Sequence, residues 1–438
     1  MSERRKTVGV LSLHNSRETK ALLNTIEALG HKPVWMRREN ISAVTEGDGV
    51  SVEPDVDVVI NRLLLSKYIK PVEDLGLLHV FQQDAEVLNS PDAVLNALHK
   101  FAAQSVLEEN GVPTPHSILG LGSRQLEDRI ESVTEENDSA VHKYPISTHG
   151  DGTTKVALDD WVPQTHRQTQ GILQELIENK GETHTDTRVY VVDGKAIGAM
   201  RRYAPDGDWR TNVSRGGNVE DVSDTLDNRA YDMAVKSAEA LGLDCAGVDL
   251  VESTDGWLVL EANPTAGFKG FFSATGVNPA PVIAQTAIER VGGKVESVDV
   301  TKLMDSLDAS IPSCRPDIDL PPVPSQNTIG YTERVQVCGS KGSSEVVAKA
   351  DTGSSQTCVG VDVAEEIGAG PIQGQKRVKG SDPSTPTKQP IVSIGIRIDD
   401  YTHDVDVIVK DRDHLKHPVL LGRDVLDHYS VNTRCRVD

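Results

Sequence analysis

The pattern of apolar and polar residues near the N-terminus predicts an α/β region. The runs VGVLSL (8–13) and DVDVVINR (55–62) are mostly apolar and are typical of buried parallel strands. Between them, SRETKALLNTIEALG (16–30) has the period of a capped amphipathic helix that ends at Gly30. We therefore expect strands and helices to alternate here.

The segment from residue 89 to 111 predicts one long helix. Ser90 and Pro91 are typical of a helix start, and Gly111 is typical of a helix end. One stripe of this helix is apolar and consists of Val94, Leu98, Ala102 and Val106. Lys100 lies off that stripe, so it is free to reach a ligand.

Short strands and turns follow. SAVHKYP (139–145) and TTKVAL (153–158) flank the glycine-containing connection ISTHGDG. Successive amides in such a loop can bind an anion, although ordinary turns also favour Gly and Asp. GILQELI (171–177) and DTRVYVVDGKAIGAMRRYA (186–204) predict antiparallel strands, the latter a hairpin that turns at Asp193 and Gly194, and a helix is expected around 223–241.

The hairpin GVDLVESTDGWLVLEAN (247–263) contains two carboxylates in otherwise apolar arms. If TDG (254–256) is a three-residue loop with Gly256 left-handed, Asp249 lies opposite Glu261. The predicted core face consists of Val248, Leu250, Leu258, Leu260 and Ala262, and the other face of Asp249, Glu261 and Asn263. Opposed acids about 5 Å apart repel each other, and a hard cation such as magnesium would relieve that repulsion. The alternative is a solvated outer face without a ligand.

A proline-rich segment predicts a domain boundary. Residues 310–327 contain five prolines, which disfavour regular structure and favour an extended spacer. Beyond it, short apolar or alternating runs broken by Gly and Pro predict an all-β domain.

Composition then narrows the class of protein. A chain of 438 residues allows about two to four domains. Its net charge of -21 argues against a nucleic-acid partner, and an anionic substrate must meet a locally basic pocket. The five cysteines lack metal-ligand spacing and are expected to be reduced thiols. We find no signal peptide or membrane span, so we expect a cytoplasmic protein with no membrane partner.

The order of lysines, glycine loop, LQELIE (173–178) and hairpin acids over residues 1–290 resembles the RimK-like branch of the ATP-grasp superfamily. The most specific pieces are the segments 186–217 and 247–276. No Walker A motif competes for the nucleotide. The resemblance implies an α/β N-terminal pre-ATP-grasp domain and an α+β ATP-grasp fold. The run EANPTAGF departs from the family's usual EVNxSPG, which leaves the amino-acid specificity open.

The resemblance also implies residue roles. ATP phosphates would be held by Lys100 and Lys143 and covered by the loop with Gly150, Gly152 and Thr153. Adenine and ribose would lie against Glu175, Leu176, Ile177 and Glu178. Magnesium (or manganese) ions would be held by Asp249, Glu261 and Asn263. The transferred phosphate and the carboxylate substrate would face Arg188, Arg202, Asn212 and Arg215, of which Arg202 is the least specific assignment.

The activity implied is carboxylate–amine ligation. A carboxylate attacks the γ-phosphate of ATP, and the resulting acyl phosphate is attacked by an amine to give an amide. The substrates would be an amino acid, such as glutamate, and a carboxylate of a peptide or small molecule.

The C-terminal segment has a second motif. Asp351-Thr352-Gly353 follows an apolar run, and HPVLLG ends at Gly422. This arrangement resembles a small retropepsin-like aspartic peptidase domain of the type associated with RimK-like ligases, which has been labelled a putative zinc protease. The zinc label has no support in the sequence, which lacks HExxH, and His414 and His417 are equally consistent with exposed loops. One catalytic Asp351 per chain implies a homo-oligomer, since the mechanism needs two aspartates.

We therefore expect four segments: residues 1–88, a pre-ATP-grasp domain; 89–295, the ATP-grasp domain; 296–327, a linker; and 328–438, the peptidase-like domain. The primary hypothesis is a ligase whose C-terminal domain trims or recognises its product. The first alternative is an aspartic peptidase in which the ATP-grasp half binds nucleotide as a regulator. The second is a non-catalytic nucleotide sensor.

Overall fold

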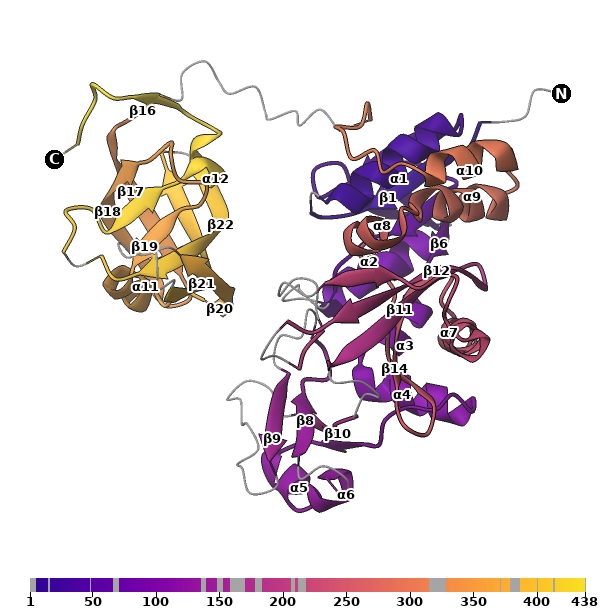
Figure 1. Ribbon diagram of the computed structural model, residues 1–438. Helices are drawn as coiled ribbons and strands as arrows, with labels where there is room; N and C mark the ends of the chain where they lie inside the picture. The colour runs from indigo at the N-terminus through magenta and orange to yellow at the C-terminus, as the bar shows by residue number, and fades with distance from the viewer. Residues whose placement is uncertain are drawn as a thin grey trace. The chain divides into compact units, whose positions relative to one another are not determined.

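The protein is divided into two compact units, Met1–Pro316 and Asp317–Asp438, each with its own apolar core (Figure 1). The computed structural model describes residues 5–14, 16–47, 49–65, 71–134, 139–147, 153–157, 170–177, 183–205, 209–211, 218–314, 328–370, 372–378, 387–399, 401–412 and 414–437. Five of the predicted site residues lie outside these ranges: Gly150, Gly152, Glu178, Asn212 and Arg215.

The first unit begins with the predicted parallel sheet. Its strands are β1 (Thr7–Leu11), β2 (Lys32–Met36), β5 (Val58–Asn61) and β6 (Glu86–Leu88), in the order β2-β1-β5-β6. Helix α1 (Arg17–Ala28) begins at Ser16, whose Oγ accepts a hydrogen bond from Thr19 N at 3.1 Å. In the sheet, β1 lies between β2, which follows it in the chain, and β5. A crevice therefore opens at the carboxyl ends of β1 and β5, where such sheets commonly bind ligands.

A hairpin of β3 (Ser42–Glu46) and β4 (Gly49–Glu53), together with helix α2 (Pro71–Gln82), completes this part of the unit. α2 packs with the sheet around a second apolar cluster that includes Leu78 and Phe81, which are 0% and 1% exposed.

The single helix predicted over 90–111 is wrong, because the structure has α3 (Pro91–Leu98) and α4 (Lys100–Glu109). His99 departs from helical geometry with φ −93° and ψ 107°, and its Nδ1 accepts a hydrogen bond from Ala102 N at 3.2 Å. The break changes the buried face, so that Leu107 is 1% exposed whereas the predicted core residue Ala102 is exposed. Lys100 becomes the first residue of α4.

Two antiparallel sheets follow, in the orders β7-β10-β8-β9 and β13-β12-β11-β14-β15. The strands are β7 (Ser117–Gly120), β8 (Ser139–Lys143), β9 (Thr154–Ala157), β10 (Gly171–Glu175), β11 (Thr185–Val192), β12 (Lys195–Tyr203), β13 (Val219–Asp221), β14 (Cys245–Glu252) and β15 (Trp257–Asn263). Helices α5 (Ser123–Glu127) and α6 (Glu131–Thr134) pack on the first sheet. The predicted turn between β11 and β12 is confirmed, with φ of 49° at Asp193 and 67° at Gly194.

Helices α7 (Asn228–Leu241), α8 (Lys269–Thr275) and α9 (Ala280–Arg290) pack against the second of these sheets. A further helix, α10 (Ser297–Met304), lies within the range 296–327 that we expected to be a linker. It packs beside α9 with Val300 5% exposed. The first proline of the rich segment is Pro312, so nothing in the preceding residues opposes a helix.

The second unit is a closed β-barrel. Its strands follow the order β17-β18-β23-β19-β22-β21-β20, and β17 also pairs with β21 to close the ring. The strands are β16 (Thr328–Gly330), β17 (Thr332–Gly339), β18 (Gly342–Ala350), β19 (Cys358–Gly360), β20 (Ile372–Val378), β21 (Thr387–Ile398), β22 (Tyr401–Lys410), β23 (Val419–Leu421) and β24 (Ser430–Asn432). The all-β prediction is confirmed, with two short helices, α11 (Val361–Ile367) and α12 (Arg423–Leu426), added to it.

Among the described residues, no helix is both long and apolar enough to cross a membrane. The five cysteines are free thiols, as expected.

Candidate active site

The acid pair of the hairpin lies at the centre of the first unit. The predicted pairing of Asp249 with Glu261 is confirmed in the β14–β15 register. Directly beyond this pair the register shifts by one, so that Leu250 pairs with Val259. Leu260 is the extra residue of a β-bulge, a feature that reorients side chains beside functional sites.

The bulge explains an error in the predicted core face. Val248, Leu250 and Ala262 are buried as expected, at 0%, 0% and 4% exposed. In place of Leu258 and Leu260, however, Trp257 and Val259 are buried, at 8% and 0% exposed. Because a one-residue shift reverses the faces of a strand, Leu260 joins Glu261 on the cavity side.

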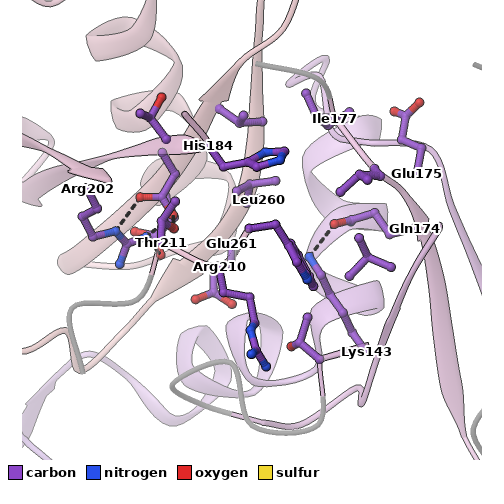
Figure 2. A pocket seen from close by; sticks show the side chains of 18 of the residues that line it. Lys143, Gln174, Glu175, Ile177, His184, Arg202, Arg210, Thr211, Leu260 and Glu261 are labelled. Carbon is purple, nitrogen blue, oxygen red and sulfur yellow. Dashed lines mark hydrogen bonds and ion pairs between the residues drawn. The ribbon is translucent and has the colours of Figure 1, made fainter. Parts of the chain in front are cut away.

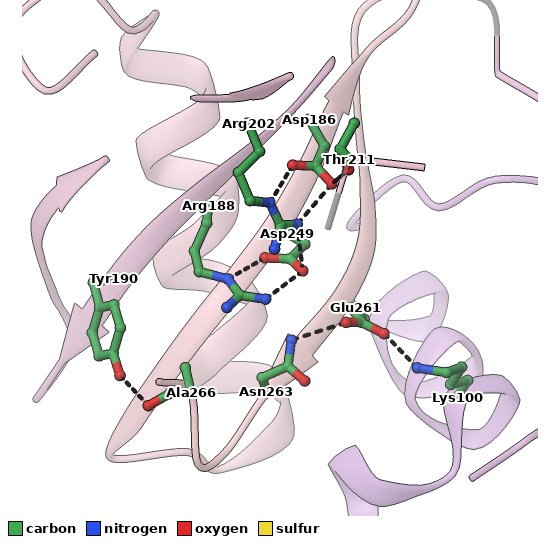
Figure 3. Close-up of polar contacts among 10 residues, drawn as sticks. All are labelled: Lys100, Asp186, Arg188, Tyr190, Arg202, Thr211, Asp249, Glu261, Asn263 and Ala266. Atoms are coloured by element: carbon green, nitrogen blue, oxygen red, sulfur yellow. Dashed lines mark hydrogen bonds and ion pairs between the residues drawn. The ribbon is translucent and has the colours of Figure 1, made fainter. Parts of the chain in front are cut away.

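Asp249 is held by two arginines from neighbouring strands (Figure 3). Arg188 binds it with two hydrogen bonds, Nε to Oδ1 at 2.6 Å and a terminal nitrogen to Oδ2 at 2.7 Å. Arg202 contacts Asp249 Oδ2 at 2.8 Å and also forms a two-hydrogen-bond pair with Asp186. Thr211 donates a further hydrogen bond to Asp186.

These charges are buried together. The side chains of Arg202, Asp186 and Asp249 are 6%, 8% and 4% exposed. Burial opposes the charge on Arg202, but Asp186 and Asp249 outweigh that effect and raise its pKa. The network therefore keeps a fixed positive group at the floor of the site, at the cost of desolvating its partners.

Glu261 makes a separate pair. Its carboxylate accepts hydrogen bonds from Lys100 Nζ and, at 3.0 Å, from Asn263 Nδ2. Burial alone would raise the pKa of Glu261, but Lys100 and Asn263 hold it well below its usual range. Glu261 is consequently ionised at neutral pH. The break at His99 starts α4 at Lys100, whose backbone N–H donates to Pro145 O at 2.8 Å.

A cavity of about 150 Å³ opens above the acid pair (Figure 2). The predicted residues that line it are Lys100, Lys143, Thr153, Glu175, Leu176, Ile177, Arg202, Asp249 and Glu261. Lys143 and Gln174, from β8 and β10, are joined by a hydrogen bond on the side opposite Arg202 and Thr211. Burial and the neighbouring Lys100 lower the pKa of the Lys143 ammonium to about 8.

Glu175 has a structural contact at the end of the same strand. Its Oε1 accepts a hydrogen bond from His116 N at 2.7 Å, and its own N–H donates to His116 O at 2.9 Å. This carboxylate therefore fixes the segment entering β7, while Leu176 and Ile177 supply an apolar wall to the cavity.

A second cavity of about 610 Å³ lies between the N-terminal sheet and the hairpin. Arg188, which we expected to face the transferred phosphate and the carboxylate substrate, and Asn263 line this cavity and not the first one. The residues shared by both cavities are Lys100, Ser147, Arg202, Leu260 and Glu261. A group bound at these residues is therefore accessible from both sides.

The predicted metal ligands provide two carboxylates and one amide. Among the described residues, no three His, Cys, Asp or Glu side chains are grouped to hold a metal. The oxygen donors of Asp249, Glu261 and Asn263 nevertheless suit a hard cation such as magnesium. Glu261 is ionised and lies opposite Asp249 in register, so the set fits such an ion once Lys100 releases Glu261 and the arginines Arg188 and Arg202 yield an oxygen of Asp249.

Several lining residues were missed by the sequence analysis. They include Ser147, Gln174, His184, Asp186, Trp209, Arg210 and Thr211 in the first cavity. Strand alternation could have identified Gln174, a buried amide in the apolar run GILQE, and Asp186, an acid two residues before Arg188. The others lie in irregular segments whose sequence carries no such signal.

Asp351 lies in the second unit, directly after β18. Ala350 of β18 pairs in parallel with Leu421 of β23, and Asp351 N donates to Leu421 O at 2.9 Å. Asp351 Oδ1 accepts a hydrogen bond from Gly353 N at 3.0 Å. The strands that carry the two motifs are thus neighbours in the barrel. The sequence has one such Asp-Thr-Gly turn, so a two-aspartate site requires a second copy.

The comparison with known proteins matches one family model to each of the two units. Residues 97–287 match the family model of the RimK-like ATP-grasp domain, and residues 334–425 match that of an aspartyl protease. A probable alpha-L-glutamate ligase 2 from Hahella chejuensis is 30% identical over 301 residues, covering 65% of this chain and 96% of that protein. A tetrahydromethanopterin:alpha-L-glutamate ligase from Methanosarcina acetivorans is 30% identical over 234 residues, covering 45% of this chain and 69% of that protein.

Solved structures show the same fold in the N-terminal two thirds of the chain. The ATP-grasp ligase PsnB, complexed with a phosphomimetic variant of its minimal precursor, Mg and ADP, gives a TM-score of 0.52 at 21% identity and covers 66% of this chain and 100% of its own. The D-cycloserine synthetase DcsG gives a TM-score of 0.52 at 19% identity, covering 65% and 99%.

Proposed function

The chain belongs to the RimK-like ATP-grasp ligases, and on that premise we propose that it joins the amine of an amino acid to a carboxylate in a reaction that needs ATP and magnesium. The observation that carries this proposal is the meeting of two cavities at Lys100, Arg202 and Glu261. Nucleotide enters the first cavity and the acceptor carboxylate enters the second. The named activities of the relatives support glutamate as the amino acid.

The residues on the nucleotide side have complementary roles. Lys143 and Lys100 bind phosphate oxygens, and Leu176 and Ile177 lie against the adenine ring. Asp249, Glu261 and Asn263 would hold magnesium, which would supply positive charge to neutralise the transferred phosphate. Lys100 contacts Glu261 in the structure, so it exchanges this carboxylate for a phosphate oxygen when nucleotide binds.

The reaction itself has two displacements. An oxygen of the acceptor carboxylate attacks the γ-phosphorus, and ADP leaves with the electron pair of the broken bond. The amine nitrogen then attacks the acyl carbon, inorganic phosphate leaves, and the nitrogen loses a proton. Arg202 is fixed by Asp186 and Asp249 before substrate arrives, so its charge is preorganised toward the phosphoryl oxygens.

The direct test is a product screen. The purified full chain is given ATP, magnesium, a panel of amino acids and cell extract, and products are measured by mass spectrometry together with ADP release. A new amide that accumulates with ADP is expected. ATP binding with neither product in any mixture would contradict the ligase and favour a nucleotide sensor.

Lys143 gives a pH prediction. Its folded pKa of about 8 means that the ammonium is charged below pH 8 and loses its proton as pH rises above it. Bound phosphates favour the charged form, so ATP binding at pH 8.5 should take up a proton, up to about one per site. Calorimetry in two buffers of different ionisation enthalpy measures this uptake. It should vanish in Lys143→Met and at pH 6.5, and persist in Lys155→Met, an exposed lysine of β9.

The retropepsin-like second unit supports a second candidate activity, peptide cleavage. Asp351 is positioned by the carbonyl of Leu421 and the N–H of Gly353, and a homodimer would supply the second aspartate. We expect Asp351→Asn to abolish any cleavage of peptides without changing ATP-dependent amide formation. Cleavage that depends on Asp351 in a chain that makes no ATP-dependent product would instead favour the peptidase with a regulatory nucleotide site.

A further inference from the structure

Arg62 occupies an unusual position in the second cavity. It follows β5 at the crevice between the carboxyl ends of β1 and β5, and it is only 6% exposed. Both terminal nitrogens donate to one carbonyl, Ala266 O, at 3.2 Å, and the guanidinium lies over the Phe268 ring at 5.0 Å. Its Nε is buried and has no hydrogen-bond partner in the described part of the chain. A buried charged group with an unused donor is costly unless a ligand completes it.

The nearby acid does not use this donor. Glu18 lines the same cavity and interacts electrostatically with Arg62, but its Oε1 accepts a hydrogen bond from Phe268 N at 3.2 Å. Glu18 therefore balances part of the charge on Arg62 and leaves Nε open. Gln104 of α4 also lines this cavity, and its Oε1 is a buried acceptor with no hydrogen-bond donor in the ranges that the structure describes.

Arg62 lies close to the reaction centre without being part of it. A Cβ added to Gly247 would lie 2.6 Å from Ala266 Cβ and 3.3 Å from Arg188 Cδ, so Ala266, whose carbonyl binds Arg62, lies near Arg188. Arg62 does not line the first cavity. Arg188 and Arg202 are engaged by Asp249 and Asp186, whereas Nε of Arg62 has no hydrogen-bond partner among the described residues.

From these contacts we propose that Arg62 binds a carboxylate of the amino acid that the ligase adds. This carboxylate takes no part in the reaction. The proposal rests on the ligase function proposed above. The incoming amino acid must bring its amine to the point where the cavities meet and keeps its carboxylate ionised throughout. A free donor on Arg62 and a free acceptor on Gln104 match the carboxylate and amine hydrogens of such a substrate.

The test is a kinetic comparison of Arg62→Gln with the wild-type chain, using L-glutamate and the acceptor identified in the product screen. The KM for L-glutamate should rise about 10- to 100-fold, because a charge-assisted hydrogen bond is lost. The KM values for ATP and acceptor should stay within about twofold. Wild type should also discriminate against glutamine or isoglutamine, whichever lacks the bound carboxylate, and Arg62→Gln should lose that discrimination. A rise in the acceptor KM alone would overturn the proposal.

Tyr190→Phe provides the matched control. Tyr190 OH donates to the same carbonyl, Ala266 O, at 2.6 Å, so this variant loosens the Ala266 loop without changing the charge of the cavity. The KM for L-glutamate should change less than about twofold in Tyr190→Phe. If it rises as in Arg62→Gln, Arg62 positions the loop and the proposal fails.

Calorimetric titration of L-glutamate into the full chain separates this proposal from the ligase function. Wild type should bind L-glutamate even when no acceptor has been found, and Arg62→Gln should bind at least tenfold more weakly. Equal binding by the two would reject the role of Arg62, even with amide formation intact. If Arg62→Gln does not fold, it is replaced by Arg62→Lys and by a comparison of glutamine with isoglutamine as substrates of the wild type. A wild type that uses both compounds as well as L-glutamate overturns the proposal.

Discussion

Glu261→Gln should reduce the rate of amide formation by about 10³-fold while leaving the protein folded, the loss expected for removing a charged group that acts on the transferred phosphate. Glu261 is ionised, faces both cavities and lies opposite Asp249 in the hairpin. The glutamine side chain keeps nearly the same volume but provides a single neutral oxygen. The substitution therefore weakens the binding of a magnesium ion at this position and removes the carboxylate that pairs with Lys100.

The rate is measured as amide and ADP formed at saturating substrates across a magnesium titration. If the rate of the variant recovers at high magnesium, the variant has lost affinity for the metal. A rate that recovers and a rate that stays low both agree with a role of Glu261 at the metal. Asp255→Asn is the matched control, since it removes one negative charge from the exposed turn of the same hairpin. A Glu261→Gln chain as active as this control at every magnesium concentration would show that the acid pair is not part of the active site.

Local sequence patterns predicted those parts of the site that depend on one strand pair. Asp249 and Glu261 oppose each other because the side-chain alternation of a hairpin determines which residues face one another. The bulge at Leu260 was not predictable in this way, because one extra residue hardly changes the pattern of apolar and polar positions. Whether the bulge forms depends on how Leu260 and Val259 pack. The resemblances to RimK-like ligases and to retropepsin-like domains are confirmed by the family matches.

Contacts between segments that are distant in the sequence could not be predicted from local sequence patterns. The break between α3 and α4 occurs at His99, a residue that a helix tolerates, and it accompanies a contact of Lys100 N with Pro145 O. Arg62 lies 204 positions from Ala266, whose carbonyl holds it. No pattern within either segment reveals this contact, because it arises only when the N-terminal sheet packs against the loop after β15.

The second large effect concerns stability. Arg202→Met should lower the free energy of unfolding of the first unit by about 3–5 kcal/mol, because it leaves buried carboxylates without their partner. Arg202 is 5% exposed and contacts both Asp186 and Asp249. Arg188 still neutralises Asp249, so most of the penalty falls on Asp186, which then keeps, among the residues that the structure describes, only the Thr211 hydroxyl. The variant should also be inactive, since the same charge faces the phosphoryl group.

Urea unfolding of the full chain, followed by tryptophan fluorescence, isolates this effect. All four tryptophans lie between residues 35 and 257, so the signal reports on the first unit alone. Arg201→Met, the neighbouring position on the opposite face of β12, should cost less than about 1 kcal/mol. Equal losses in the two variants would mean that the network does not stabilise the unit.

The loss should also depend on pH. Burial already raises the pKa of Asp186, and removing Arg202 raises it further. In the variant, the folded state then takes up a proton at a pH where the unfolded chain does not, so its stability rises as the pH falls. The deficit against wild type should be largest at neutral pH and shrink toward pH 5. Adding Asp186→Asn to Arg202→Met removes the buried charge outright, and the double variant should recover part of the loss at neutral pH. A deficit independent of pH and unrelieved by Asp186→Asn would instead assign the loss to the packing of the Arg202 side chain.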